Sequence, residues 1–381
     1  MKFFLQDFLS FIPQNLVTDT KNFHNHFLSD ITSNSKNVVS ASGFIAVRGV
    51  NVNGELFIES AIASGAAVIF LESTCEELSQ KYPETTFIRV TNARLINSLS
   101  CQFNYVDVLD KLSLLGVTGT NGKTTTAYLF YQIFAKLNQK SGIISTVECF
   151  DGVNFSASTQ TTPAAEKLFP LLGACAVNNC RYVPMEVSSH ALSQFRLGTL
   201  KFKYALFTNL TGDHLDYYEN MENYYQAKKT FFLNHAETAI INLDDRWGER
   251  LCAELKSETD LKILTFSAKK QSDFMLEINS DENYSLFSLN GVKFKFNLLG
   301  EYNIYNLCGV LIALNEENYL LTEVAKIIDD NEFTVPGRLE LIRLAHGAKV
   351  FIDYAHTDDA LANVLKSLQK ITHKRIIRVF E

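Results

Sequence analysis

The chain has 381 residues, of which 46% are apolar and 20% charged, and its formal net charge at pH 7 is -7. This length exceeds what one hydrophobic core usually serves, so two or three domains are expected. The composition is that of a globular protein, and the acidic balance argues against a nucleic-acid scaffold. The cysteines are scattered, odd in number and without a CxxC pair, which argues against disulfides or zinc and favours a reducing cytoplasm.

The N-terminal segment resembles a secretion signal only briefly. Asp7 interrupts its apolar run, and Pro13 follows without a small-residue cleavage site, so an amphipathic first helix is the better interpretation. No apolar stretch of the sequence approaches the roughly 18 residues of a membrane-spanning helix. We therefore predict a cytoplasmic protein that does not insert into a membrane.

The first predicted unit covers residues 1–105. Residues 37–72 have the pattern of two strands, a helix and a further strand. The apolar runs at 43–47 and 66–71 are typical of buried strands, and residues 56–63 have helical spacing. These patterns predict a compact α/β unit.

The second predicted unit covers residues 106–334 and alternates strands with helices. A short apolar strand at 113–117 precedes a glycine- and threonine-rich turn, and residues 124–140 have one apolar helical face. This alternation predicts a largely parallel sheet covered on both faces. Asn290-Gly291, between alternating apolar residues, predicts a hairpin. Further strands are expected at 182–187, 204–210, 238–243 and 263–266.

The third predicted unit covers residues 335–381. It contains a strand at 349–353, a helix at 360–371 and a second strand at 375–380. One βαβ unit cannot bury both faces of its sheet, so we expect the beginning of an incomplete domain with exposed apolar faces. The chain is then expected to be marginally stable or to associate through residues 336–381.

The turn after the strand at 113–117 has the composition of a phosphate loop. Its glycines can turn backbone NH groups toward a polyphosphate, Lys123 can reach the β- and γ-phosphates, and Thr124 can ligate Mg²⁺. Gly116 lies six rather than five positions before Gly122, so the loop is a variant of the Walker pattern. Binding of ATP or GTP is predicted. The residues expected at the nucleotide are Gly119, Thr120, Asn121, Gly122, Lys123, Thr124 and Thr125.

Several ordered segments resemble those of the Mur ligase family, and in particular its MurE branch. Their agreement covers nearly the whole chain, and MEVSSH with DYAHT favours the MurE branch over its sister ligases. In chain order the segments are TGTNGKTTT (118–126), MEVSSH (185–190), FTNLTGDHLD (207–216), YYQAK (224–228), GEYNIYN (300–306), VPGRLE (335–340) and DYAHT (353–357).

This resemblance implies a three-domain α/β architecture and an amide-forming ligase. The domains would be a small UDP-binding α/β domain, a central sheet like that of P-loop ATPases and an incomplete Rossmann-like domain. The implied reaction adds meso-diaminopimelate or L-lysine to UDP-N-acetylmuramoyl-L-alanyl-D-glutamate, with ATP activating the carboxylate as an acyl phosphate. We expect a monomer with these small-molecule partners, apart from possible association through the incomplete domain.

The resemblance also implies which side chains carry the chemistry. Phosphoryl transfer gathers negative charge, so it depends on Mg²⁺ and positioned cations, and Mg²⁺ prefers oxygen ligands. Lys228 is implied to carry CO₂ as a carbamate, which requires a neutral amine and hence a lowered pKa. The adjacent Lys229 is expected to be a surface lysine. The implied catalytic residues are Lys123, Glu186, His214 and Lys228, and the implied ligands of two Mg²⁺ ions are Thr124, Glu186, His214 and Lys228.

Two further groups of residues are implied to bind ligands. Helix capping is the alternative role for the two asparagines, and a salt bridge or a capping carboxylate is the alternative for Arg338 and Asp353. The nucleotide group adds Asn303, Asn306, Arg338 and Asp353 to the phosphate loop. The muramoyl-substrate group comprises Ser35, Thr161, Thr162, Ser188, Gln194 and Arg196.

Departures from the family pattern leave an alternative function open. Gly212 stands where the family has arginine, Asn34 where it has an acidic residue, and the family's amino-acid-binding segment has no counterpart before Glu381. A truncated, catalytically incomplete ligase that only binds nucleotide and UDP-sugar is therefore the alternative. Folylpolyglutamate and cyanophycin synthetases share the ATPase core, but MEVSSH and the Thr-Thr-Pro turn at 161–163 argue against them.

Overall fold

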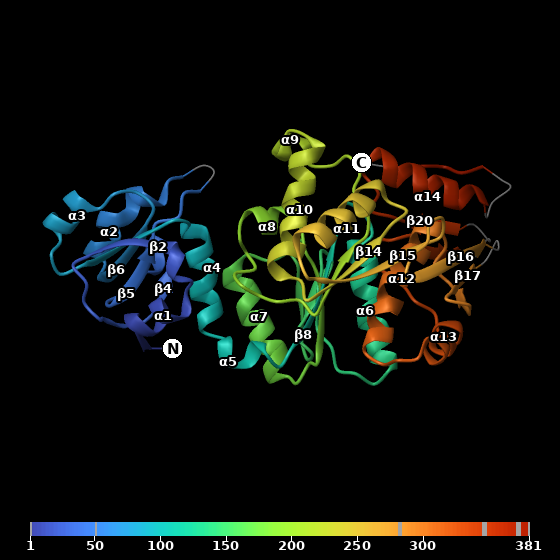
Figure 1. The fold of residues 1–381 in the computed structure, drawn as a ribbon, viewed down its shortest axis with the longest axis horizontal. Helices are drawn as coiled ribbons and strands as arrows, with labels where there is room; N and C mark the ends of the chain where they lie inside the picture. Colours follow the sequence, from blue (N-terminus) through green and yellow to red (C-terminus); the bar gives the residue numbers. More distant parts are fainter. Residues whose placement is uncertain (1, 50–51, 281–283, 345–348, 371–374, 380–381) are drawn as a thin grey trace. The chain divides into compact units, whose positions relative to one another are not determined.

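In the computed structural model, which describes residues 2–49, 52–280, 284–344, 349–370 and 375–379, the chain forms two compact units (Figure 1). One comprises Met1–Asp110, Pro163–Gly173 and Ser193–Leu200, and the other comprises Lys111–Thr162, Ala174–Leu192 and Lys201–Glu381. The predicted α/β class is confirmed, whereas the predicted domain boundaries near 105 and 334 stay a prediction. No helix in the described part of the chain has the length and apolarity needed to cross a membrane.

The first unit is built on a five-stranded sheet in the order β2-β7-β6-β5-β4, in which β2 alone runs antiparallel to its neighbour. Apolar side chains lie on both faces, with Val68 in one core cluster and Ile69 in the other. The elements are β1 (Phe3–Phe4), α1 (Leu5–Phe11), β2 (Val17–Lys21), β3 (Phe27–Leu28), β4 (Ile31–Thr32), β5 (Ser42–Ile45), α2 (Ile58–Ala63), β6 (Ala66–Leu71), α3 (Glu76–Lys81), β7 (Thr86–Val90), α4 (Ala93–Phe103) and α5 (Val106–Leu109).

The second unit is built on an eleven-stranded sheet in the order β11-β10-β9-β12-β8-β13-β14-β15-β16-β17-β18. The strands from β9 to β16 in this order run parallel, and antiparallel pairs flank them. Its strands are β8 (Ser113–Thr118), β9 (Ile143–Ile144), β10 (Glu148–Phe150), β11 (Phe155–Ala157), β12 (Tyr182–Glu186), β13 (Tyr204–Phe207), β14 (Thr238–Asn242), β15 (Lys262–Ser267), β16 (Phe274–Ser280), β17 (Ser285–Leu289) and β18 (Val292–Phe296).

Helices cover both faces of this sheet (Figure 1). Leu115 and Val117 of β8 belong to a core shared with α6 and α12. Gly116, between them, points to the other face, where an added Cβ would lie 2.3 Å from Phe231 of α10. The helices are α6 (Lys123–Lys136), α9 (Leu215–Tyr218), α10 (Met221–His235), α11 (Arg246–Glu258), α12 (Glu301–Glu316) and α13 (Leu321–Asp329); α7 (Ala165–Val177) and α8 (Ser189–Ser193) contribute residues to both units.

The carboxyl ends of three adjacent parallel strands meet at one edge of this sheet. Val117 of β8 pairs with Glu186 of β12, and Thr118 pairs with Phe207 of β13. The segments that follow these strands are therefore neighbours, although long stretches of sequence separate them.

The predicted Asn290-Gly291 hairpin is confirmed, since these residues join β17 to β18. Asn290 has a φ of 47° and Gly291 a φ of 81°. Two positive φ values match the twist of a two-residue hairpin, and asparagine followed by glycine tolerates them at low cost.

Residues 335–381 differ from the predicted strand–helix–strand order. An unpredicted strand, β19 (Glu340–Arg343), pairs antiparallel with β20 (Lys349–Ile352), and α14 (Asp358–Lys370) follows. The connection between the two strands is too short for a parallel crossover, which needs about a dozen residues or more. Of the second predicted strand, residues 375–379 contain no strand and Phe380 lies outside the described residues, as does residue 371 of the predicted helix.

Candidate functional site

The phosphate loop joins β8 to α6 and depends on its glycines. Gly119 and Gly122 have φ values of +147° and +88°, which L side chains rarely adopt. A Cβ on Gly119 would lie 2.0 Å from Thr208 Oγ1, and a Cβ on Gly122 would lie 2.2 Å from Asn306 Oδ1. The close approach of both neighbours therefore leaves no room for a side chain at either position.

Gly119→Ala is expected to weaken ADP and ATP binding by about tenfold or more, because a side chain in this conformation costs about 1–3 kcal/mol and the loop must move. Isothermal titration of the purified variant measures the effect. Gly291→Ala is the matched control, since Gly291 also has a positive φ of 81° but open space around it. Unchanged nucleotide affinity in Gly119→Ala would contradict the assignment of this loop.

Residues after β13 hold the loop in place. The backbone N–H of Thr120 donates to Asn209 O (2.9 Å), and that of Asn121 donates to Asn209 Oδ1 (3.0 Å). Thr208 Oγ1 donates to Asn121 O (2.7 Å). Sequence analysis assigned no role to Thr208 or Asn209, although both lie in the FTNLTGDHLD segment, which is the signal that could have found them.

Two lysines converge on one carbonyl group of the loop. Lys123 Nζ donates to Gly119 O (2.9 Å) and Thr120 O (2.7 Å), and Lys228 Nζ of α10 also donates to Gly119 O (2.9 Å). Lys228 is only 1% exposed, and its Nζ lies 4.6 Å from the Tyr224 ring centroid. Burial, and then the neighbouring charge of Lys123, lower the pKa of Lys228 well below its ordinary value. Burial also lowers the pKa of Lys123.

Glu186 places a buried carboxylate near the amine of Lys123. It ends β12 and accepts hydrogen bonds from Thr146 N (2.7 Å) and Thr146 Oγ1 (3.2 Å). Burial raises the pKa of Glu186, while the charge of Lys123 lowers it. The two predicted substrate threonines lie beside it: Thr162 Oγ1 donates to Glu186 O (2.8 Å), and Thr161 Oγ1 accepts from Thr146 Oγ1 (3.2 Å).

His214 lies in a strained turn at the start of α9, with a φ of 53°. Its Nε2 lies 3.5 Å from Asp213 Oδ2, and its ring centroid lies 4.9 Å from that of His190. Asp213 is a further carboxylate that lines the same cavity as Glu186, and sequence analysis assigned it no role.

Arg338 and Asp353 reach the same region from the C-terminal part of the chain. Arg338 Nη2 donates to Thr124 Oγ1 (3.0 Å) at the start of α6. Asp353 accepts hydrogen bonds from Leu339 N (2.7 Å) and Ala355 N (2.8 Å). These bonds hold the local turns, which is the role of a capping carboxylate that the sequence analysis left open as an alternative.

These groups line one cavity of about 260 Å³. The hydroxyl of Thr124 and the carboxylate of Glu186 supply oxygen donors of the kind that suits Mg²⁺. Gly119, which belongs to the loop, and Lys228, which donates to it, do not line the cavity surface. The predicted residues that do line it are Thr120, Asn121, Gly122, Lys123, Thr124, Thr125, Thr161, Glu186, His214, Asn303, Asn306, Arg338 and Asp353.

Comparisons with known proteins identify the family of this chain. Residues 117–314 match the Mur ligase middle domain, and residues 337–381 match the Mur ligase glutamate ligase domain. The chain belongs to the Mur ligase family. It is 35% identical to a UDP-N-acetylmuramoyl-L-alanyl-D-glutamate--2,6-diaminopimelate ligase of Clostridium tetani over 93% of this chain and 73% of that protein. A ligase of the same name from Phocaeicola vulgatus is 37% identical over 90% and 70%.

Solved structures of Mur ligases share the fold. A structure named UDP-N-acetylmuramoyl-L-alanyl-D-glutamate--2,6-diaminopimelate ligase superposes with a TM-score of 0.78 at 26% identity, covering 97% of this chain and 74% of that one. A folylpolyglutamate synthase of Mycobacterium tuberculosis complexed with ADP has a TM-score of 0.57 at 15% identity over 72% and 69%, which shows likeness of fold alone.

The predicted muramoyl-substrate residues of this Mur ligase are divided between the two units. Ser35, Gln194 and Arg196 lie in the first, and Ser188 lies in the second with Thr161 and Thr162. Gln194 Oε1 accepts from Arg196 Nη2 (2.8 Å), and Ser188 Oγ accepts from Ala191 N (3.2 Å). Asn34, at the position where the family has an acidic residue, accepts from Lys36 N (3.1 Å) and begins a short helical turn. Substrate binding by these residues stays a prediction.

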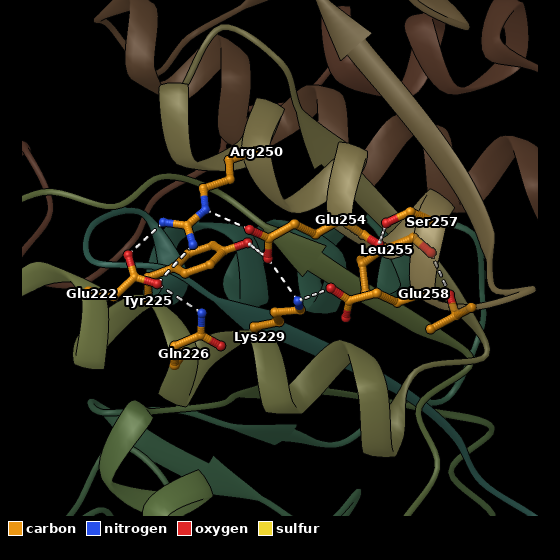
Figure 2. Close-up of polar contacts among 10 residues, drawn as sticks. Glu222, Tyr225, Gln226, Lys229, Arg250, Glu254, Leu255, Ser257 and Glu258 are labelled. Carbon is orange, nitrogen blue, oxygen red and sulfur yellow. Dashed lines mark hydrogen bonds and ion pairs between the residues drawn. The ribbon is translucent and has the colours of Figure 1, made fainter.

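The prediction that Lys229 is an ordinary surface lysine is wrong. Lys229 is 6% exposed, and its Nζ pairs with Glu254 Oε2 (2.8 Å) and Glu258 Oε1 (2.7 Å) of α11, as Figure 2 shows. The neighbouring helix supplies both carboxylates, and helical spacing within α10 alone could not reveal them.

Gly212 stands where the family has arginine. A Cβ added at Gly212 would meet nothing within 4 Å, so a side chain is sterically allowed there.

Proposed function

We propose that the chain is an ATP-dependent ligase that joins 2,6-diaminopimelate to UDP-N-acetylmuramoyl-L-alanyl-D-glutamate. The observation that carries the proposal is the cavity that Lys123 and Thr124 of the phosphate loop line together with Glu186. The relatives of this chain bear the name of this activity. L-Lysine is the alternative amino acid substrate, and its activity is compared with that of diaminopimelate. We also infer a cytoplasmic monomer with these small-molecule partners and no nucleic acid.

The proposed reaction has two steps. An oxygen of the substrate carboxylate forms a bond to the γ-phosphorus of ATP, the bond from that phosphorus to the β–γ bridging oxygen breaks, and ADP leaves. The amine nitrogen then bonds to the acyl carbon, phosphate leaves with the carboxylate oxygen, and the amine loses a proton. Positioning and charge stabilisation carry most of the catalysis in such a transfer.

The chain's own residues fit these tasks. Lys123 now donates to two loop carbonyls, and by exchanging them for phosphate oxygens it would keep its hydrogen bonds while gaining a charge partner. Thr124 and Glu186 would hold Mg²⁺, with His214 near them. Bound Mg²⁺ supplies neutralisation of the charge on the transferring phosphoryl group. Arg338, already on Thr124, would contact the nucleotide from the C-terminal side, and Asn303 and Asn306 would contact it from α12.

We further propose that Lys228 carries CO₂ as a carbamate. Its burial and lowered pKa support this proposal, because only the neutral amine can add to CO₂. The neutral amine nitrogen forms a bond to the carbon of CO₂ and releases one proton, and the resulting carbamate would offer oxygen atoms to a second Mg²⁺. The charge of the nearby Lys123 would stabilise the resulting anion.

An isotope-transfer experiment tests the proposed reaction. The UDP-muramoyl-dipeptide is labelled with ¹⁸O in its carboxylates and incubated with the chain, ATP, Mg²⁺, bicarbonate and diaminopimelate. An acyl phosphate transfers one ¹⁸O from the reacting carboxylate to the phosphate released. Phosphate without label, in a reaction that forms product, would overturn the mechanism, and binding of both substrates without any product would support a ligand-binding protein instead.

A further inference from the structure

We propose that Lys229 is a positioning residue, whose ion pairs with α11 fix the rotation of α10 and thereby hold Lys228 against the phosphate loop. The role of Lys228 rests on the proposed function, whereas the contacts that fix α10 stand on the structure.

Adjacent lysines of α10 point to different neighbours. Tyr224 and Lys228, one turn apart, face the loop: the Thr120 hydroxyl donates to Tyr224 Oη (3.4 Å), and Lys228 Nζ donates to Gly119 O. Tyr225 and Lys229 lie about 100° further round the helix, facing α11. Any rotation that pulled Lys229 from α11 would therefore also displace Lys228 from the loop.

The helix that receives Lys229 is itself firmly held. The Asp245 carboxylate caps α11 by accepting from Trp247 N (2.9 Å) and Gly248 N (3.0 Å). Gly248 packs so closely on β14 that an added Cβ would lie 2.1 Å from Asn242 O, and Leu255 is fully buried. Because α11 is fixed to the sheet by its cap and its packing, it can serve as the reference against which α10 is oriented.

Glu254 is the centre of the contact between the two helices (Figure 2). Its carboxylate accepts from Lys229 Nζ (2.8 Å), Tyr225 Oη (2.8 Å) and Arg250 Nε (2.6 Å). Burial raises the pKa of Glu254, but these donors outweigh burial and bring it to about 2. Arg250 then reaches back to α10 through Glu222 (2.6 and 2.8 Å). Glu254 is therefore charged at neutral pH and tied to both helices.

Besides its packing and its contact with the Tyr224 ring, Lys228 makes one hydrogen bond. Within the residues that the structure describes, no carboxylate lies within ion-pair distance of Lys228 Nζ, and its acceptor is the single carbonyl of Gly119. Lys229 has two carboxylate partners on α11, at 2.7–2.8 Å. Lys229, with its two ion pairs to α11, is thus placed to orient the helix that carries Lys228.

Lys229→Met is the direct test, with Lys229→Arg as the conservative variant and Lys270→Met as the matched control. Lys270 also pairs with α11, through Glu249 (2.6 Å), but that pair is exposed and neither of its residues belongs to α10. We expect Lys229→Met to lose about tenfold or more in kcat, because small misplacements of reacting groups have such effects. The ¹³C NMR carbamate signal formed from ¹³C-bicarbonate should weaken in parallel, while the Kd for ADP stays within about twofold. Lys229→Arg should keep most of the kcat and of the carbamate signal, and Lys270→Met should match the unmodified chain in both quantities.

Wild-type kcat and carbamate signal in Lys229→Met, beside an inactive Lys228→Met, would overturn this proposal alone. Full activity in Lys228→Met would overturn the carbamate and the positioning role together, so the two failures are distinguishable. If Lys229→Met does not fold, Glu258→Gln removes one of the two partners from a half-exposed site. An intermediate loss of carbamate signal in that variant supports the proposal, and no loss overturns it.

Discussion

Lys228→Met is expected to abolish ligase activity while making the fold more stable. Burial lowers the pKa of Lys228 well below its ordinary value, so the folded chain holds a proton on this amine less readily than the unfolded chain does. Methionine carries no such cost, and we expect a gain of about 1 kcal/mol in unfolding free energy, as is common when a strained functional residue is replaced. Phosphate release and chemical denaturation measure the two effects.

The lowered pKa of Lys228 determines how the stability difference between the two chains changes with pH. The pKa of folded Lys228 is lowered, so the unfolded state binds more protons between that pKa and the ordinary value of 10.5, and the stability of the unmodified chain rises with pH in this window. The advantage of methionine should therefore shrink as pH approaches 10.5. Lys201→Met, at an exposed position, should change neither activity nor stability. A destabilised or fully active Lys228→Met would contradict the role given to the buried amine.

Glu186→Gln is expected to lower kcat by about 100-fold or more, the loss typical when a group that stabilises transition-state charge is removed. Glutamine keeps the shape and can still accept from Thr146, but it removes the negative charge beside Lys123 and Thr124. The Mg²⁺ concentration needed for half-maximal activity should rise, whereas ADP affinity without Mg²⁺ should change little. Titration of activity against Mg²⁺ separates the two.

Glu148→Gln is the matched control for this prediction. Glu148 is a nearby carboxylate on β10 that accepts from the Tyr128 hydroxyl (2.9 Å) and does not line the cavity. It should keep its activity and its Mg²⁺ dependence. Equal losses in the two variants would mean that Glu186 acts by supporting the fold and not by holding a metal.

Local sequence signals predicted much of this architecture. The phosphate loop and the Asn290-Gly291 turn were predictable because glycine conformation and strand alternation act over a few residues. The family resemblance assigned Glu186 and Lys123 to one site, and the structure explains this by the parallel pairing of β12 with β8, which brings the carboxyl ends of both strands to one edge.

Features that depend on distant residues were not predictable in the same way. Asn209 holds the loop by hydrogen bonds across the sheet edge, and Thr146 fixes the Glu186 carboxylate from a segment far away in the sequence. Lys229 looked like an exposed helical lysine because nothing in α10 reveals the carboxylates of α11. The β19–β20 pairing was missed because β19 is short and mostly exposed, so it lacks the apolar signal of a buried strand.

The central claim is that this cavity activates a carboxylate for attack by an amine, and product formation tests it most directly. The chain is incubated with ATP, Mg²⁺, bicarbonate and UDP-N-acetylmuramoyl-L-alanyl-D-glutamate, with diaminopimelate or L-lysine in separate reactions, and product mass is followed with ADP release. The account predicts a tripeptide product with diaminopimelate, and one ADP for each amide formed. A folded chain that binds both nucleotides yet forms no amide with either amino acid would contradict it.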